Sequence, residues 1–412
     1  MTYRNALRTP ANLAPLLLGC LPLAASADFI DDASVNLTMR NFYFNRDFRQ
    51  DGAAQSKREE WAQGFALDAR SGYTDGVIGL GLDLYGALGI KLDSADDRAG
   101  TGLLPNRFGD AGPDRYSDVS GRLKARVSKT EIKYGGFTPR SPILLTSDAR
   151  LLTPLFNGLT LESRDLDGWV LEAGRLTSVN YRDSSANHDD FVAANYGVSS
   201  DRFDYFGSTW QVSPHSSLAY WYAELADTYQ QHYFGYNGSQ KLDDWTLTAN
   251  LGYFDSREAG RQRAGDIDSR LLTSWVSAGR GPHTLRLGYQ RNHGDSPFPH
   301  LQDADSNVAN VVQVLDFTRP GERSWQARYD FNFAALGVPG LTALVRYLRG
   351  DQYALHGEEG REWERDLDVS YVVQDGPWKN LGIRWRNATM RSDIAGDIDE
   401  NRLILSYSIP LK

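Results

Sequence analysis

The chain has 412 residues and a formal net charge of −9 at pH 7, which argues against a protein that binds nucleic acid through a basic surface. Its mean hydropathy is −0.48, and no stretch after residue 27 approaches the roughly 20 apolar residues that a membrane-spanning helix needs. This excludes a helical membrane protein but not a membrane β-barrel, in which only every second strand residue must be apolar.

The first 27 residues have the organisation of a secretory signal peptide. Arg4 and Arg8 form a basic n-region, residues 13–23 form an apolar h-region, and Ala25-Ser26-Ala27 is a cleavage site of the A-x-A type. Cleavage there leaves a single domain at residues 28–412, because no change in composition divides the rest of the chain.

Cys20 is the only cysteine of the chain and raises one alternative. Residues 17–20, Leu-Leu-Gly-Cys, have the form of a lipobox, which would make Cys20 the lipidated first residue of a lipoprotein. If the A-x-A site is used instead, the mature chain has no cysteine, and both disulfides and cysteine–metal sites are excluded.

Apolar and polar side chains alternate in the strand-like segments that follow. In residues 381–386, Arg384 and Arg386 share one face of a strand, because side chains alternate between faces. Another segment carries cations on one face and apolar residues on the other: Arg122, Lys124 and Arg126 against Leu123, Ala125 and Val127. Such a pattern, repeated over many strands, favours a barrel with its apolar face toward lipid and its polar face toward a lumen.

We predict eighteen strands, near residues 34–46, 59–72, 76–91, 117–129, 130–137, 157–165, 168–180, 201–212, 216–228, 230–242, 244–257, 269–280, 282–293, 322–335, 340–351, 361–375, 378–391 and 400–411. Tight turns alternate with long polar loops near residues 47–58, 92–116, 181–200, 258–268, 294–321 and 392–399. Short turns on one rim and long loops on the other are typical of outer-membrane barrels. The predicted fold class is therefore all-β, a transmembrane antiparallel β-barrel of eighteen strands.

One long segment, residues 137–156, differs from the polar loops because it is apolar and contains three prolines. Those prolines make it an unsuitable wall strand. An apolar loop must pack against something, and the lumen of a wide barrel is the available place. We expect this loop to fold inward and narrow the pore, with Ser147, Asp148 and Arg150 facing the narrowest point.

The sequence contains no recognisable catalytic motif. There is no G-x-S-x-G, no H-E-x-x-H and no EF-hand loop, and the seven histidines are scattered. We therefore expect no enzyme activity, no metal and no cofactor. The alternatives from other classes are a barrel hydrolase of the outer membrane, a secreted soluble β-protein that binds carbohydrate, and a structural barrel with a plugged lumen.

Six segments together resemble the OprD family of outer-membrane porins. They are residues 40–47 (RNFYFNRD), 124–130 (KARVSKT), 293–298 (HGDSPF), 321–330 (GERSWQARYD), 337–342 (GVPGLT) and 371–374 (YVVQ). The resemblance spans nearly the whole mature chain. It implies a monomeric eighteen-stranded barrel in the bacterial outer membrane, whose third long loop folds inward and whose lumen carries a ladder of arginines and lysines for a solute carboxylate.

Carried over to this sequence, the ladder falls on Arg40, Lys124, Arg126, Arg150, Arg384, Arg386 and Arg402. The alternation adds three residues of inward parity: Arg122, Arg328 and Arg346. Asp295, in the family-like segment 293–298, is a candidate for the constriction, where it would hold an amino or hydroxyl group or pin its own loop. Asp366 and Asp368 are also inward by parity. Their negative charges would produce an electric field across the lumen, opposite the cations. For each ladder cation the alternative is a salt bridge between wall and loop.

The expected function is downhill, selective passage of small carboxylates. An arginine fork matches a carboxylate in bidentate fashion, and a row of weak sites lets a solute pass from one to the next. The chain is more similar to the family branch that favours aromatic or cyclic carboxylates, such as benzoate, than to the branch for basic amino acids or small peptides, because its long loops are comparatively short.

The expected partners are small carboxylates, outer-membrane lipid and lipopolysaccharide, and the barrel-assembly machinery. We expect a monomer or weak oligomer that binds no nucleic acid. The chain departs from the common barrel pattern in ending on Lys412 rather than on an aromatic residue.

Overall fold

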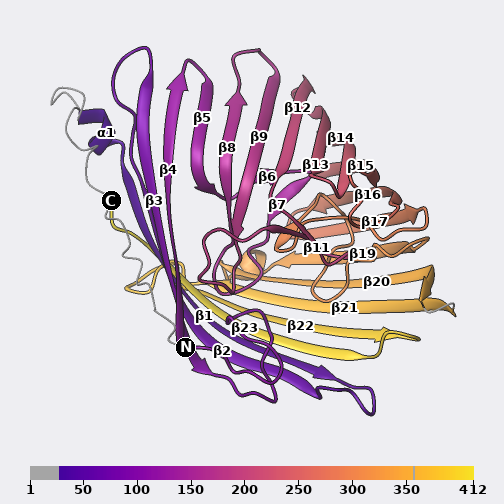
Figure 1. The fold of residues 1–412 in the computed structure, drawn as a ribbon. Helices are drawn as coiled ribbons and strands as arrows, with labels where there is room; N and C mark the ends of the chain where they lie inside the picture. The colour runs from indigo at the N-terminus through magenta and orange to yellow at the C-terminus, as the bar shows by residue number, and fades with distance from the viewer. Residues whose placement is uncertain (1–26, 356–357) are drawn as a thin grey trace, which may run out of the picture.

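The computed structural model describes residues 27–355 and 358–412, which form an eighteen-stranded antiparallel barrel (Figure 1). The first nine wall strands are β1 (Ser34–Phe48), β2 (Lys57–Arg70), β3 (Gly79–Asp93), β4 (Arg115–Val127), β5 (Thr130–Phe137), β8 (Leu155–Ser163), β9 (Trp169–Asn180), β12 (Phe203–Ser213) and β13 (Ser216–Leu225). The other nine are β14 (Tyr229–Leu242), β15 (Trp245–Glu258), β16 (Asp268–Arg280), β17 (His283–His293), β19 (Arg323–Asn332), β20 (Leu341–Leu355), β21 (Glu358–Val372), β22 (Gly382–Ser392) and β23 (Ile398–Pro410). The wall closes because β1 pairs with both β2 and β23.

The predicted fold class is confirmed, with strand bounds that differ from the expected ones by a few residues. Helical structure in the described ranges is limited to α1 (Ala27–Asp31) and a 3₁₀ turn, η1 (Phe333–Leu336). Neither has the length and apolar composition to cross a bilayer. The expected signal peptide and Cys20 lie outside the described residues, apart from Ala27.

The distribution of apolar side chains is inverted relative to that of a soluble protein. Leu123, Trp325 and Leu403 are 61%, 46% and 44% exposed on the outer surface of the wall. On the inner face, by contrast, Asp118 and Asp366 are buried at 5% and 2% exposure. Since water would not favour such an apolar exterior, the barrel presents it to lipid, as the alternation predicts.

The two rims differ in the length of their connections. The short-turn rim carries tight connections such as those between β4 and β5 and between β16 and β17, whereas the long-loop rim carries connections such as those after β3, β5, β9 and β17. Both ends of the described chain lie at the short-turn rim, because Val35 N–H donates to the Lys412 carbonyl at 3.0 Å and Lys412 Nζ donates to Ile30 O. This arrangement follows from the even number of strands.

Residues 138–154, here called the inward loop, lie inside the ring of strands between β5 and β8 (Figure 1). The loop contains the short strands β6 (Arg140–Ser141) and β7 (Leu144–Thr146). Leu144, Leu151 and Leu152 are 1%, 3% and 5% exposed. Leu151 packs against Gly64 of β2 so closely that a Cβ there would lie 3.1 Å from Leu151 Cγ. The sequence prediction that this loop folds into the lumen is confirmed.

A second inward loop, residues 294–322 between β17 and β19, corrects the sequence analysis, which placed this segment among the polar rim loops. Its strand β18 (Ala304–Asp305) pairs with β7 of the inward loop. Phe298, Leu301 and Phe317 are 2%, 3% and 2% exposed. The two loops therefore meet inside the barrel in a small three-stranded sheet, β18-β7-β6. The remaining short pair, β10 (Phe191–Ala193) and β11 (Val198–Ser200), belongs to the loop after β9.

We predict that Leu151 and Leu152 hold the inward loop against the wall. Replacing both with serine removes buried apolar contacts, each worth about 2–5 kcal/mol for large-to-small core changes, and should make the loop cleavable by trypsin at Arg140 or Arg150. The matched control is Leu145→Ser, since Leu145 is 38% exposed on the same loop. If the double variant resists trypsin as well as the wild type while the barrel keeps its folded gel mobility, the packing account is wrong.

Candidate functional site: the charged lumen

Arg40 on β1 ties the inward loop to the wall. Its Nη1 and Nη2 donate to Asp148 Oδ1 and Oδ2 at 2.8 and 2.9 Å, and Nη1 also donates to the Arg150 carbonyl at 2.6 Å. Asp148 remains 55% exposed at its side chain. Beside this contact lies a cavity of about 390 Å³, lined by Arg40, Tyr85, Arg122 and Asp148 among others. The structure thus brings Arg40 and Asp148 together at the edge of the lumen, as a wall-to-loop ion pair.

Ser147 and Arg150, the other expected constriction residues of this loop, are anchors in the structure. Ser147 is 6% exposed, and its N–H donates to the Asp303 carbonyl of the second inward loop at 3.1 Å. Arg150 Nε donates to the Thr101 carbonyl at 2.8 Å, and its guanidinium lies 5.1 Å from the ring centroid of Phe44. The backbone of Ser147 and the side chain of Arg150 therefore fix the loops, and neither residue lines the cavity beside them.

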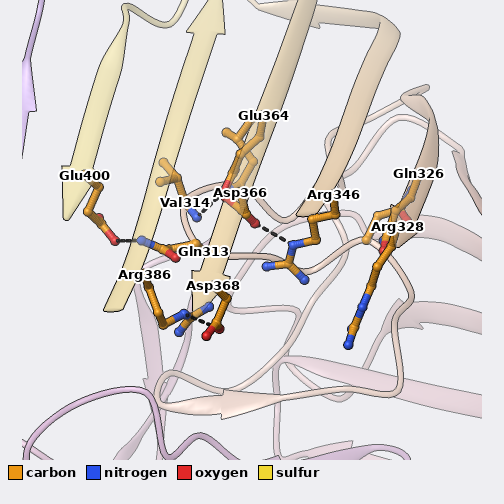
Figure 2. Close-up of polar contacts among 12 residues, drawn as sticks. Gln313, Val314, Gln326, Arg328, Arg346, Glu364, Asp366, Asp368, Arg386 and Glu400 are labelled. Atoms are coloured by element: carbon orange, nitrogen blue, oxygen red, sulfur yellow. Dashed lines mark hydrogen bonds and ion pairs between the residues drawn. The ribbon is translucent and has the colours of Figure 1, made fainter. Parts of the chain in front are cut away.

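Arg384 and Arg386 on β22 share a single acid partner, Asp368 on β21. The Nη2 of Arg384 lies 2.5 Å from Asp368 Oδ2. The Nε of Arg386 lies 3.3 Å from the same oxygen (Figure 2). Arg384 is 46% exposed at its side chain and Arg386 16%. Two cations with one anion leave a net positive charge on this part of the lumen wall.

The same two-to-one arrangement occurs on β3 and β4. Arg122 Nη2 and Lys124 Nζ lie 2.5 and 2.7 Å from the carboxylate oxygens of Asp83. Arg126, two residues further along β4, has no acid partner in residues 27–355 and 358–412, and its guanidinium lies 4.1 Å from the ring centroid of Tyr73. The expected ladder residues of β4 are thus on the inner face and together carry more positive than negative charge.

Arg328 and Arg346 are each paired with their own carboxylate. Arg328 Nη2 lies 2.5 Å from Asp330, and Arg346 Nε donates to Asp366 at 2.5 Å (Figure 2). Asp366 and Asp368 therefore act as counter-ions of neighbouring arginines. This corrects the expectation that they form a separate acidic field, because the antiparallel register places Arg346 opposite Asp366 and Arg386 opposite Asp368.

Arg402 on β23 is enclosed rather than open to a solute. Its side chain is 2% exposed, its Nε donates to Glu400 at 2.6 Å, and its Nη2 donates to the Gln313 carbonyl of the second inward loop at 2.9 Å. Arg402 is therefore held by a salt bridge within the wall strand β23 and by a hydrogen bond to the loop, which is neither the expected solute contact nor the alternative salt bridge between wall and loop.

Asp295, the last expected constriction residue, lies in the second inward loop just after β17 and is exposed. It is absent from the residues that line the cavity beside the inward loop. Asp303 has the closer association with that loop, since its carbonyl accepts from Ser147 and its carboxylate lies 3.0 Å from Arg182 Nη2.

Two other acids of the loops have a raised pKa. Burial, reinforced by repulsion from Asp303 and opposed by Arg182, raises the pKa of Asp183 to about 6. Burial, followed by repulsion from Asp316, raises the pKa of Asp305 above its ordinary value. Because Asp183 would change charge between pH 5 and 7, the charge beside the loops depends on pH in this range.

The acids that hold the second inward loop were not among the site residues expected from the sequence. Glu364 on β21 accepts from the backbone N–H groups of Val314 and Leu315 at 2.9 and 2.8 Å. Glu400 on β23 accepts from Gln313 Nε2 at 3.0 Å (Figure 2). The signal was present, since Glu362, Glu364, Asp366 and Asp368 alternate along one face of β21, but only the tertiary structure shows what they bind.

Arg286 on β17 was also missed, although the same alternation identifies it. It lies between Leu285 and Leu287, which are 50% and 51% exposed on the outer surface, so Arg286 belongs to the inner face. Its guanidinium lies 4.1 Å from the ring centroid of Trp275 on β16.

The charges on the inner wall are chemically suited to weak binding of anions. Arginines that already donate to an aspartate keep further N–H donors for a passing carboxylate. Within the described part of the chain, no three His, Cys, Asp or Glu side chains are grouped so as to hold a metal ion.

Comparison with known proteins agrees with this geometry. The family model described as outer membrane porin, OprD family, matches residues 27–411. The porin-like protein GalP of Pseudomonas putida is 40% identical over 400 residues, which is 96% of each chain. The crystal structure of OccK9 (OpdG) from Pseudomonas aeruginosa superposes with a TM-score of 0.91 at 50% identity, covering 93% of this chain and 100% of that one.

A further structure, that of Pseudomonas aeruginosa OpdK with vanillate, has a TM-score of 0.88 at 40% identity over 93% of this chain and 100% of that one. Members of this family are channels of the outer membrane rather than enzymes. The chain belongs to the OprD family of substrate-specific outer-membrane porins.

Proposed function

We propose that this porin is a passive channel for small aromatic or cyclic carboxylates, such as benzoate. The observation that carries the proposal is the repeated excess of cations over acids on the inner wall. Arg384 and Arg386 share Asp368, and Arg122 and Lys124 share Asp83. Each group can attract a carboxylate without losing the ion pair that holds it in place.

The interaction energy between a carboxylate and each charged group is small enough to favour passage of the solute over tight binding. In water, two unit charges 4 Å apart interact by about 1 kcal/mol, and the partner aspartate offsets part of the attraction. A carboxylate would therefore bind each group weakly and leave for the next one, as a conducting pore requires. The structure of OpdK with vanillate supports an aromatic solute, since vanillate is an aromatic carboxylate.

A basic amino acid or small peptide is the second candidate. The observation that favours it is the exposed carboxylate of Asp148, 55% accessible beside Arg40, which offers an acceptor for an amino group. Competition between benzoate and arginine for uptake discriminates between the two candidates.

We also propose that residues 1–27 are a signal peptide removed on export and that the mature protein works as a monomer or weak oligomer among outer-membrane lipids, after insertion by the barrel-assembly machinery. N-terminal sequencing of the mature protein would find Asp28 if this is correct, and a lipidated Cys20 if it is not.

We predict that replacing Arg384 and Arg386 together with alanine lowers benzoate uptake into liposomes by about tenfold, the effect of losing one charged hydrogen bond. Uptake of a neutral sugar should stay unchanged. The matched control is Arg361→Ala with Arg365→Ala, because these arginines of the neighbouring β21 are exposed on its outer face. Equal losses for benzoate and sugar would indicate a collapsed pore and contradict the proposed role of the pair.

We predict that the passage of anions also depends on Asp183. Because the pKa of Asp183 is raised to about 6, a rise from pH 5 to pH 7 adds a negative charge beside the loops. Uptake of benzenesulfonate, which stays ionised throughout, should fall by up to about fivefold, the effect of about 1 kcal/mol between like charges 4 Å apart in water. Asp183→Asn should remove this pH dependence, and Asp201→Asn, which changes an exposed acid near the end of the same loop, should keep it. An unaltered pH profile in Asp183→Asn would contradict the assignment.

A further inference from the structure

Arg286 is a lumen-facing cation that has no ion-pair partner in the described part of the chain. Within residues 27–355 and 358–412 it has no acid within salt-bridge distance and no hydrogen-bond acceptor, and its Nε is buried without a partner. Its position is nevertheless defined, because the guanidinium lies against Trp275 with 4.1 Å between its Cζ and the ring centroid. A cation–π contact of this kind orients a guanidinium without using its N–H donors.

The neighbouring strands place further arginines in line with Arg286. In the antiparallel register Arg286 is directly opposite Arg328, and Arg328 is directly opposite Arg346. Like charges in directly opposed positions destabilise a sheet. Asp330 and Asp366 compensate Arg328 and Arg346, so that three guanidinium groups are balanced by two carboxylates. The row of Arg286, Arg328 and Arg346 therefore has one carboxylate too few, and Arg286 is the arginine without a counter-ion among the described residues.

A cavity beside this row connects it with the Arg384 pair. Its volume is about 500 Å³, and its lining includes Thr284 of β17, Arg328, Asp368 and Arg384. Thr284 is two residues from Arg286 on the same strand, so both side chains lie on the inner face. A solute that leaves Arg384 therefore enters a space lined by Thr284 and Arg328, the neighbours of Arg286 along its strand and across the sheet.

We propose that Arg286, backed by Trp275, is the binding residue of an additional carboxylate subsite on the β17–β20 wall, and that this subsite takes small aromatic carboxylates. The carboxylate would accept from the unused N–H donors of Arg286 and supply the negative charge that the row lacks. An aromatic ring can stack on the guanidinium face turned away from Trp275. The choice of an aromatic carboxylate as ligand rests on the proposed function.

Arginine labelling tests the subsite directly. Folded wild-type protein is treated with phenylglyoxal in the presence of benzoate or of benzamide, which has the same ring but no carboxylate, and modification is read at each arginine by peptide mass spectrometry. Benzoate, but not benzamide, should slow modification of Arg286 by about tenfold. Arg280, which lies 5.6 Å from the ring centroid of Trp245 with outward parity, is the internal control and should react equally with both compounds.

Two results at Arg286 would overturn the proposal. One is equal labelling with benzoate and benzamide, and the other is no labelling at all while Arg280 reacts, since the side chain would then be closed to solutes. A second arm compares benzoate uptake by Arg286→Gln and Arg280→Gln, of which only the first should lose uptake, by severalfold.

The labelling readout separates failure of the subsite from failure of the proposed function. A wild-type channel that takes up benzoate no better than a neutral sugar would contradict the function, whereas labelling at Arg286 would still decide the subsite. A wild-type channel that selects benzoate, with Arg286 unprotected and Arg286→Gln fully active, would contradict the subsite alone.

Discussion

Ion pairs and hydrogen bonds made by carboxylates on the inner wall are the interactions on which the rest of this structure depends. Glu400, fully buried, lies 2.5 Å from Arg46 Nη2 and 2.6 Å from Arg402 Nε, and it also accepts from Gln313 of the second inward loop. Removing one partner of such a buried pair costs about 3–5 kcal/mol, because the other charge is left uncompensated. Without these acids the second inward loop would lose its anchors on the wall, and the lumen would be wider and far more positive.

The same carboxylates set the strength of the anion path. Each acid that is shared between two cations, as Asp368 and Asp83 are, leaves a small net charge in place of a free arginine. A set of such groups attracts carboxylates but binds none of them tightly, and tight binding at any one point would block the pore. Arg126 and Arg286 are different, since each lies on an aromatic ring at 4.1 Å rather than on an acid.

The wall of the barrel was predictable from the sequence, because side chains in a strand alternate between its two faces every two residues. This alternation recurs in many successive segments of the chain. The inward faces of Arg122, Arg346 and Arg384 followed from that repeat. The pairing of these arginines did not, because it depends on which residues of separate strands lie opposite each other. The apolar composition and the prolines of residues 137–156 predicted one inward loop. The second, residues 294–322, is polar along much of its length, and its inward course depends on Glu364 and Glu400, which are distant in sequence.

Recognition of the solute's carboxylate by the lumen is the property on which the proposed function depends. The most direct test is a single-channel current recorded with increasing benzoate or benzamide, two rings of similar size that differ in charge. Benzoate should cause brief interruptions of the current whose frequency rises with its concentration, and benzamide should cause none. In the Arg384→Ala, Arg386→Ala double variant the interruptions should become far less frequent. Identical traces with the two compounds would contradict this recognition of the carboxylate.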